Sequence, residues 1–435
     1  MKNNRILLSI TGIVAFLFIA SVVYSIMNEN DPYEYYTGLG DSISISPDDT
    51  TLAFSYYMNG NEAIYKGDIE SKNVERITDP EEEDHRKPLF SPDGEGLLYV
   101  ASNSDGVQTM YYRPDLDKDK TIQLTKAATH VFSAAISPDG SKVYYVAMPS
   151  DDFLKPEGEQ ENGADLYSVN INGSQPQKLT DKDAFAMTEL SISDDGTTLY
   201  YTAFHDGKQQ LFSYNIDNGT ESLFLQEHTS DGIYHPVLSP DENRLAYTAV
   251  ADKSENGTFQ YELFLMDISN GDSKRLTDYN ASVTSPSFFH DNDKTRIAFL
   301  AETNWPSEPS AYQIMTISYD GEDATPVELD LPESSNDIQP GAIADKLVNA
   351  ITMSGLYVLL FSLLTVYYHS ASNKTYFPAI LSAILTGIVF LSSFATAAFY
   401  NAWAGIGLFM LVVMLVGCTT VIFMFALIYS KFVKR

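Results

Sequence analysis

Six copies of one short hairpin motif follow one another through the middle of this chain. In five copies a Ser precedes the turn, as in Ser-Pro-Asp-Gly, and the sixth turn, at 290–293, departs from the motif. The five residues lie 45, 46, 56 and 46 positions apart: Ser46, Ser91, Ser137, Ser193 and Ser239. Each hairpin precedes an extended segment with an aromatic residue, and then a short segment that ends in Ile-Thr or Leu-Thr in four copies. Four strands per repeat, at a period of about 40 to 50 residues, are typical of a propeller blade. The repeats predict an all-β fold: a six-bladed β-propeller with four antiparallel strands per blade.

The turn residues support this division into strands. In Ser-Pro-Asp-Gly, Pro sets φ at the second position, Asp bonds nearby backbone, and Gly accepts a positive φ. Asn-Gly pairs at 172–173, 218–219 and 270–271 suit a tight turn between the third and fourth strands. We expect no helix between Asp31 and Leu331, since no segment there has a helical pattern.

The repeats resemble those of the TolB-type propeller family. The resemblance is carried by Pro-x-Phe-Ser-Pro-Asp-Gly-like turns such as PLFSPDG from Pro88, by Ile-Tyr-x-x-Asp-like strands such as IYKGD from Ile64, and by Leu-Thr endings. It covers residues 40–331 and implies a six-bladed propeller that binds proteins or ligands. The chain departs from the family pattern at Asp194, which replaces Pro, and at the sixth turn.

Four apolar runs lie outside the repeats, at 6–27, 348–368, 377–399 and 405–429. Each is long enough to cross about 30 Å of hydrocarbon as a helix. The predicted organisation is therefore a cytoplasmic N-terminus (1–5), a signal-anchor helix (6–27), a linker (28–39), the propeller (40–331), a second linker (332–347), three further membrane helices and a basic cytoplasmic tail (430–435).

Basic residues outside the repeats predict the orientation. The residues that indicate it are Lys2, Arg5, Lys374, Lys431, Lys434 and Arg435. By the positive-inside rule, both termini are cytoplasmic and the propeller is extracytoplasmic in a multi-pass cell-membrane protein. A cleaved signal peptide at 6–27 is the alternative, because Ser21–Ser25 offers small residues near its end. The single cysteine, Cys418, lies in the last apolar run, so the exported section has no disulfide.

Charge limits the partners. Between Asn28 and Ile343 there are 20 Lys or Arg against 57 Asp or Glu residues, a formal charge of −37. This excess argues against nucleic acid as a partner. The last three apolar runs have no Asp, Glu, Lys, Arg or His in their middles but many small residues, which disfavours transport and suits a membrane-protein partner.

Topology predicts how the propeller is attached. Closure of the propeller requires residues near Gly40 and Leu331 to be neighbours, so the domain is tethered at one seam. We expect the face that carries the connections between blades to lie toward the bilayer.

Polar residues four positions before each turn Ser, with their neighbours, are expected at the mouth of the axial channel. These funnel candidates are Asp41, His85, Arg86, Lys87, Glu189, Tyr234 and His235. Trp305, in a longer loop, is a candidate recognition residue. The alternatives are solvated loop residues without a ligand and, for Trp305, a packed aromatic. We expect no metal and no cofactor.

No catalytic motif is present. The sequence has no Gly-x-Ser-x-Gly, no His-Glu-x-x-His and no phosphate-binding Gly loop, so we expect no catalytic residues and no enzyme. The chain is predicted to be a membrane-tethered scaffold that binds a protein or a small-molecule envelope ligand at the cell surface, with a membrane protein as a further partner. Two alternatives stay open: an exported propeller hydrolase with axial carboxylates, and a sensor that couples ligand binding to its helices.

Overall fold

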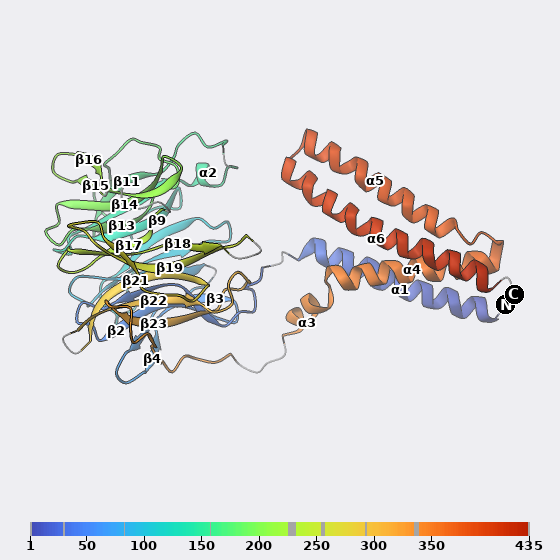
Figure 1. The fold of residues 1–435 in the computed structure, drawn as a ribbon, viewed down its shortest axis with the longest axis horizontal. Helices are drawn as coiled ribbons and strands as arrows, with labels where there is room; N and C mark the ends of the chain where they lie inside the picture. Colours follow the sequence, from blue (N-terminus) through green and yellow to red (C-terminus); the bar gives the residue numbers. More distant parts are fainter. Residues whose placement is uncertain are drawn as a thin grey trace. The chain divides into compact units, whose positions relative to one another are not determined.

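The structure is a computed structural model that describes residues 2–28, 31–81, 83–156, 158–224, 232–253, 257–291, 294–334 and 339–433. The turn at 292–293 and the basic residues Lys434 and Arg435 lie outside this description. The chain divides into two compact units: Pro32–Ser335, and Met1–Asp31 together with Asn336–Arg435. Pro32–Ser335 is mostly β and contains antiparallel sheets (Figure 1).

Three sheets are formed by the first part of this unit, each from four strands consecutive in sequence. The first contains β1 (Gly38–Ile45), β2 (Thr51–Met58), β3 (Asn61–Asp68) and β4 (Val74–Arg76). The second contains β5 (Asp84–Phe90), β6 (Leu97–Ser102), β7 (Gln108–Arg113) and β8 (Ile122–Gln123). The third contains β9 (Thr129–Ile136), β10 (Lys142–Pro149), β11 (Asp165–Asn170) and β12 (Gln177–Lys178).

The remaining strands form one sheet of four and one of eight. The sheet of four contains β13 (Thr188–Ile192), β14 (Thr198–His205), β15 (Lys208–Asn215) and β16 (Glu221–Leu223). The first half of the eight-stranded sheet contains β17 (Tyr234–Leu238), β18 (Arg244–Lys253), β19 (Phe259–Asp267) and β20 (Ser273–Arg275). Its second half contains β21 (Ser282–Asp291), β22 (Lys294–Glu302), β23 (Tyr312–Ser318) and β24 (Thr325–Pro326). A single parallel pairing, Tyr261 with Ser282, joins the halves.

The Ser and Asp of the repeated turn bond each other and the backbone. In the third copy, Ser137 Oγ donates to Asp139 Oδ1 (2.6 Å) and accepts from the Lys142 amide (2.9 Å), while Asp139 Oδ1 also accepts from the Ser141 amide (3.0 Å). These hydrogen bonds lower the pKa of Asp139 to about 2. The same pairing occurs at Ser193 and Asp195, so the replacement of Pro by Asp194 leaves the turn intact.

The Thr of the Leu-Thr ending ties the fourth strand to the third. Its hydroxyl accepts from a third-strand amide, as at Thr125, which accepts from Met110 (2.8 Å). Thr277 accepts from Leu263 (2.9 Å) and also donates to the carboxylate of Glu262, which is 0% exposed. The Thr of the motif therefore links the third and fourth strands by a hydrogen bond.

The beginning and the end of the unit pack together. Phe54 of β2 lies in one apolar cluster with Leu300 of β22, and Leu331 packs against this cluster. A Cβ added to Gly67 would lie 2.9 Å from Leu329 Cδ1, so the segment after β24 contacts the first sheet closely. The residues near the two ends of the repeat section are thus neighbours, as sequence topology predicted.

Helices occupy most of the other unit. They are α1 (Lys2–Met27), α3 (Pro340–Leu347), α4 (Ala350–Ser372), α5 (Phe377–Phe399) and α6 (Ala402–Phe432). In the described residues, all of these except α3 include a segment long and apolar enough to cross a membrane. Asn349 and Asn401 cap α4 and α6 by accepting backbone amide hydrogen bonds. Hydroxyls of Tyr357, Ser382 and Thr419 join α4, α5 and α6, at 2.8 and 2.7 Å.

Two short helices were not predicted. The four-residue helix α2 (Ser150–Phe153) follows β10, so the expectation of no helix between Asp31 and Leu331 is wrong there. Stacking of Phe153 on His130, with ring centroids 3.5 Å apart, holds this turn against the third sheet. The other helix, α3, begins with Pro340 at its first turn, a position that Pro favours, and lies in the predicted linker.

Candidate functional site

A cavity of about 420 Å³ lies where the first strands of successive sheets meet. It is lined by residues of β1, β5, β9, β13, β17 and β21, the strands that begin each repeat. One polar lining residue from each is Asp41, Lys87, Ser133, Glu189, His235 and Ser285. The positions four residues before the turn Ser, which include Ser42 next to Asp41, therefore converge on one space.

Backbone irregularities direct these side chains. The pairing of each first strand with its second strand shifts register at this level. Four residues there have positive φ, near 50°, although none is Gly: Lys87, Glu189, His235 and Ser285. A β-bulge with a left-handed residue bends a strand and redirects its side chain. The repeated bulge thus turns one side chain per strand toward the cavity.

Hydrogen bonds link the first four of these strands across the cavity wall. The Lys87 amide donates to Ser42 Oγ (3.1 Å), which joins β5 to β1. The Lys87 ammonium donates to the Phe132 carbonyl (2.8 Å), which joins β5 to β9. The Leu190 amide then donates to Ser133 Oγ (2.9 Å), which joins β13 to β9.

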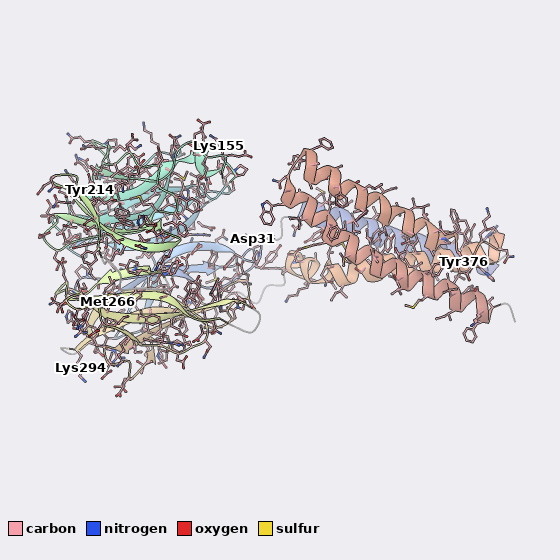
Figure 2. All side chains as sticks on the ribbon, turned by 45° about the horizontal axis from the view of Figure 1, so that its top comes forward. Asp31, Lys155, Tyr214, Met266, Lys294 and Tyr376 are labelled. Atoms are coloured by element: carbon pink, nitrogen blue, oxygen red, sulfur yellow. The ribbon has the colours of Figure 1, made fainter. Side chains whose placement is uncertain are left out.

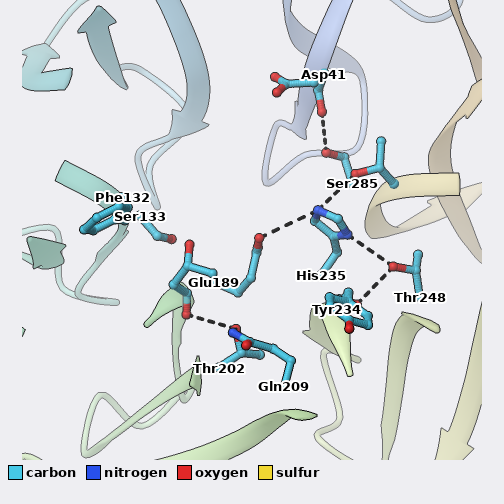
Figure 3. Close-up of polar contacts among 12 residues, drawn as sticks. Asp41, Phe132, Ser133, Glu189, Thr202, Gln209, Tyr234, His235, Thr248 and Ser285 are labelled. Atoms are coloured by element: carbon cyan, nitrogen blue, oxygen red, sulfur yellow. Dashed lines mark hydrogen bonds and ion pairs between the residues drawn. The ribbon is translucent and has the colours of Figure 1, made fainter. Parts of the chain in front are cut away.

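Contacts of the other two strands, β17 and β21, close this set of contacts into a cycle (Figure 3). Glu189 Oε1 lies 3.7 Å from His235 Nε2, and the same nitrogen lies 3.1 Å from Thr284 Oγ1. Ser285 Oγ donates to the Asp41 carbonyl (2.8 Å), which returns the cycle to β1. Contacts between neighbouring first strands therefore run around the whole cavity.

The lining carries charges of both signs. Lys87 also donates to Gln108 Oε1 (3.1 Å), and burial lowers the pKa of its ammonium, against the raising effects of Asp41 and Glu189. His235 is fixed on its other side by Thr248 Oγ1, 3.2 Å from Nδ1. One ammonium and two carboxylates in a confined space can bind a small ligand that has both a cationic and an anionic group.

Three of the funnel candidates lie outside this cavity. His85 packs on Tyr99, with ring centroids 4.9 Å apart, and burial lowers the pKa of its imidazole to about 4. Arg86 forms ion pairs with the buried Glu62 and, at 3.1 Å, with Asp84. These contacts give His85 and Arg86 structural roles in the second sheet.

Tyr234 and Trp305 also form packing contacts. The Tyr234 ring meets Tyr261 edge to face at 5.4 Å, and the Trp305 ring also meets Tyr261 edge to face, at 6.5 Å. The indole Nε1 of Trp305 donates to the Phe259 carbonyl (3.0 Å), and this hydrogen bond holds the loop that contains Trp305 against β19. Trp305 is thus half-buried and bridges two halves of the eight-stranded sheet.

Sequence reasoning missed Phe132 and Gln108, which place the Lys87 ammonium. Lys87 reaches the Phe132 backbone carbonyl and the Gln108 side chain, at the start of β7, only because the fold brings these strands together. No sequence signal identifies them. Among the residues that the structure describes, no three His, Cys, Asp or Glu side chains form a group that could hold a metal ion.

Comparison with solved structures supports a propeller-like fold. TolB from Acinetobacter baumannii matches with a TM-score of 0.52 and 17% sequence identity, over 66% of each chain. Residues 82–205 match the family model described as the dipeptidyl peptidase IV N-terminal region, a propeller domain. The resemblance to TolB-type propellers is therefore confirmed for the fold.

Two curated relatives are named peptidases. The chain is 25% identical over 233 residues to the uncharacterized peptidase YuxL of Bacillus subtilis, which covers 52% of this chain and 31% of that protein. It is 32% identical over 155 residues to dipeptidyl-peptidase 5 of Porphyromonas endodontalis, which covers 35% of this chain and 20% of that protein. The chain spans less than a third of either relative.

Proposed function

We propose that this chain is a membrane-tethered binding protein whose β unit is a six-bladed propeller with a ligand site on its axis. Each four-stranded sheet, and each half of the eight-stranded sheet, is then one blade. The closed cycle of contacts among the six first strands supports this arrangement, because propeller blades meet at their innermost strands.

The tether in this proposal consists of the long apolar helices. Both termini are cytoplasmic and the propeller is outside the cell, an orientation supported by the basic residues at the helix ends and by the acidic repeat section. The exposed apolar surfaces of α5 and α6 would contact lipid or a partner membrane protein.

The ligand in this proposal is a short peptide with free termini. The mixed-charge cavity carries the argument: a peptide carboxylate would pair with Lys87, and a peptide ammonium with Asp41 or Glu189. A cavity of about 420 Å³ is large enough for a few residues. The names of the two relatives add support, since a peptidase acts on peptides.

Calorimetric titration of the full-length protein in detergent with a pool of tripeptides tests the proposal. We expect binding that weakens when both peptide termini are blocked. Glu189→Gln should reduce affinity about tenfold, because a charge-assisted hydrogen bond contributes about 1.5 to 3 kcal/mol.

Glu322→Gln is the matched control, because Glu322 is exposed in the turn before β24, away from the cavity. Blocked and free peptides that bind equally, or equal effects of the two substitutions, would rule out the axial site.

A peptidase is the second candidate function, favoured by the names of the relatives. In that case the same tripeptides would be cleaved, and Glu189→Gln would abolish cleavage that Glu322→Gln leaves unchanged. Mass spectrometry of the incubated pool separates binding from cleavage.

A further inference from the structure

The exposed large apolar side chains in the described part of Pro32–Ser335 are few and share one location. They are Leu154, Phe185, Phe204, Phe259 and Tyr279, and the first four are 49 to 56% exposed. Their positions in the strand order show what they share.

Strand direction defines two faces of the β unit. In a four-stranded antiparallel sheet, the connection between the second and third strands lies at the same end as the start of the first strand and the end of the fourth. We call this end the junction face; it carries connections such as β2–β3 and β10–β11 and the links between sheets. Because the links between consecutive sheets are short, such as 124–128 between β8 and β9, the junction ends of neighbouring sheets lie on the same side of the β unit. Figure 2 shows Lys155, from the β10–β11 connection, on the side opposite to Tyr214 and Lys294.

All five exposed apolar residues lie at the junction face. Leu154 lies in the β10–β11 connection, Phe204 next to the β14–β15 hairpin and Phe259 at the start of β19. Phe185 and Tyr279 lie in the links β12–β13 and β20–β21. The rings of Phe185 and Phe204 meet edge to face at 6.1 Å and form one exposed aromatic pair.

Both terminal segments of the β unit are fixed at the same face. The Tyr36 carbonyl accepts from the Gly60 amide (2.9 Å) in the β2–β3 turn. At the other end, β24 is a fourth strand and runs toward the junction face, and the following Pro332 carbonyl accepts from the Tyr56 hydroxyl (2.7 Å), near the end of β2. Beyond these segments the chain continues into α1 and α3–α6.

We propose that the junction face binds the surface of a zwitterionic lipid bilayer through Leu154, Phe185, Phe204 and Phe259. Exposed aromatic and aliphatic side chains on one face enter the region between headgroups and acyl chains. The terminal segments lie at the first sheet and β24, whereas the exposed apolar residues lie on the third sheet and the sheets that follow it. Two separate areas of the junction face would therefore hold it at the bilayer. The acidic excess of the repeat section opposes binding to anionic lipids. This inference rests on the proposed membrane insertion of the helices.

Lipid-dependent fluorescence quenching of the full-length protein tests the proposal. The single cysteine is replaced by Cys418→Ala, and an NBD label is placed at Leu154→Cys or Phe204→Cys in vesicles of phosphatidylcholine. The control label is at Asn270→Cys, an exposed residue in the turn between β19 and β20 on the opposite face. Phosphatidylcholine with a doxyl group near the headgroup should quench the two junction-face labels and leave the label at 270 unchanged. The quenching should weaken when anionic lipid is added at low salt.

The other outcomes overturn the proposal in different ways. A label at 204 that is quenched by aqueous iodide and not by doxyl lipid would show an open, hydrated face. A label shielded from both quenchers would show that protein, either a partner or a second copy, covers the face. A label at Val413→Cys, on the exposed side of α6, must be quenched by deep doxyl lipid. If deep doxyl lipid does not quench the label at 413, the membrane insertion itself is refuted. If it quenches the label at 413 but doxyl lipid does not quench the label at 204, only the lipid-binding face is refuted.

Discussion

The hydroxyl of Thr277 should contribute more stability than the equivalent hydroxyl of Thr125. Both residues are buried, with 5 and 6% exposure, and both accept a hydrogen bond from a third-strand amide. Only Thr277 also donates to a buried carboxylate, that of Glu262. Replacement by Val keeps the shape of the side chain and removes the hydroxyl in each case.

The structure sets the expected magnitudes. Thr125→Val leaves the Met110 amide without its acceptor, which costs about 1 to 3 kcal/mol. Thr277→Val has the same cost and also removes a donor from an ionised group, a further loss of about 1.5 to 3 kcal/mol. We expect the lower end of this range, about 2 kcal/mol, because Glu262 keeps its hydrogen bond from the Asn280 amide (2.8 Å) and its ion pair with Arg275 (3.4 Å).

Thermal unfolding of the full-length protein in detergent, followed by near-ultraviolet circular dichroism, provides the assay. A difference of about 2 kcal/mol corresponds to a melting temperature about 3 °C lower for Thr277→Val than for Thr125→Val, because the unfolding entropy of the unit Pro32–Ser335 is about 0.6 kcal/mol/K. Equal melting temperatures for the two variants would refute the reasoning, since the carboxylate contact would then contribute nothing.

Two further predictions follow from burial and packing. His130 is 4% exposed, and burial, with Lys87 nearby, lowers the pKa of its imidazole to about 4. The unfolded state binds this proton more readily, so about 3 kcal/mol of stability should be lost as pH falls from 6.5 to 4. Urea unfolding should show that loss reduced in His130→Gln but not in the control His205→Gln, and parallel profiles would contradict it. Gly67→Ala should cost about 1 to 3 kcal/mol, because the new methyl group meets Leu329. A double-mutant cycle with Leu329→Ala should show a coupling of about 1 kcal/mol, whereas additive effects would mean that the two residues do not touch.

Much of the β architecture could be predicted from the sequence because local chemistry repeats. The Ser-x-Asp turn and the Leu-Thr ending each satisfy specific backbone amides, so their spacing marks the strands directly. The helices α2 and α3 escaped prediction because they are short. A stacked His130–Phe153 pair holds α2, a contact that no local pattern reveals.

The candidate site was predictable in position but not in detail. Lys87, Glu189 and His235 line the cavity because a bulge with left-handed backbone recurs at that register. Non-Gly residues rarely adopt this conformation, so tertiary contacts, and not residue type, determine it. His85 and Arg86 precede the bulge and point elsewhere, which sequence adjacency could not distinguish.

The attachment of both terminal segments to the first sheet has a mechanical consequence. The leading segment is bonded to Gly60 and the trailing segment to Tyr56, and the Asp330 amide also donates to the Lys72 carbonyl (2.9 Å) in the turn after β3. Tension applied at either end is therefore carried by β2, β3 and their turns. Because Leu329 packs closely against Gly67, a force that separates the two ends would act directly on this contact. The first sheet therefore transmits such a force to the β unit, and the named contacts of the terminal segments involve no loop of the third sheet.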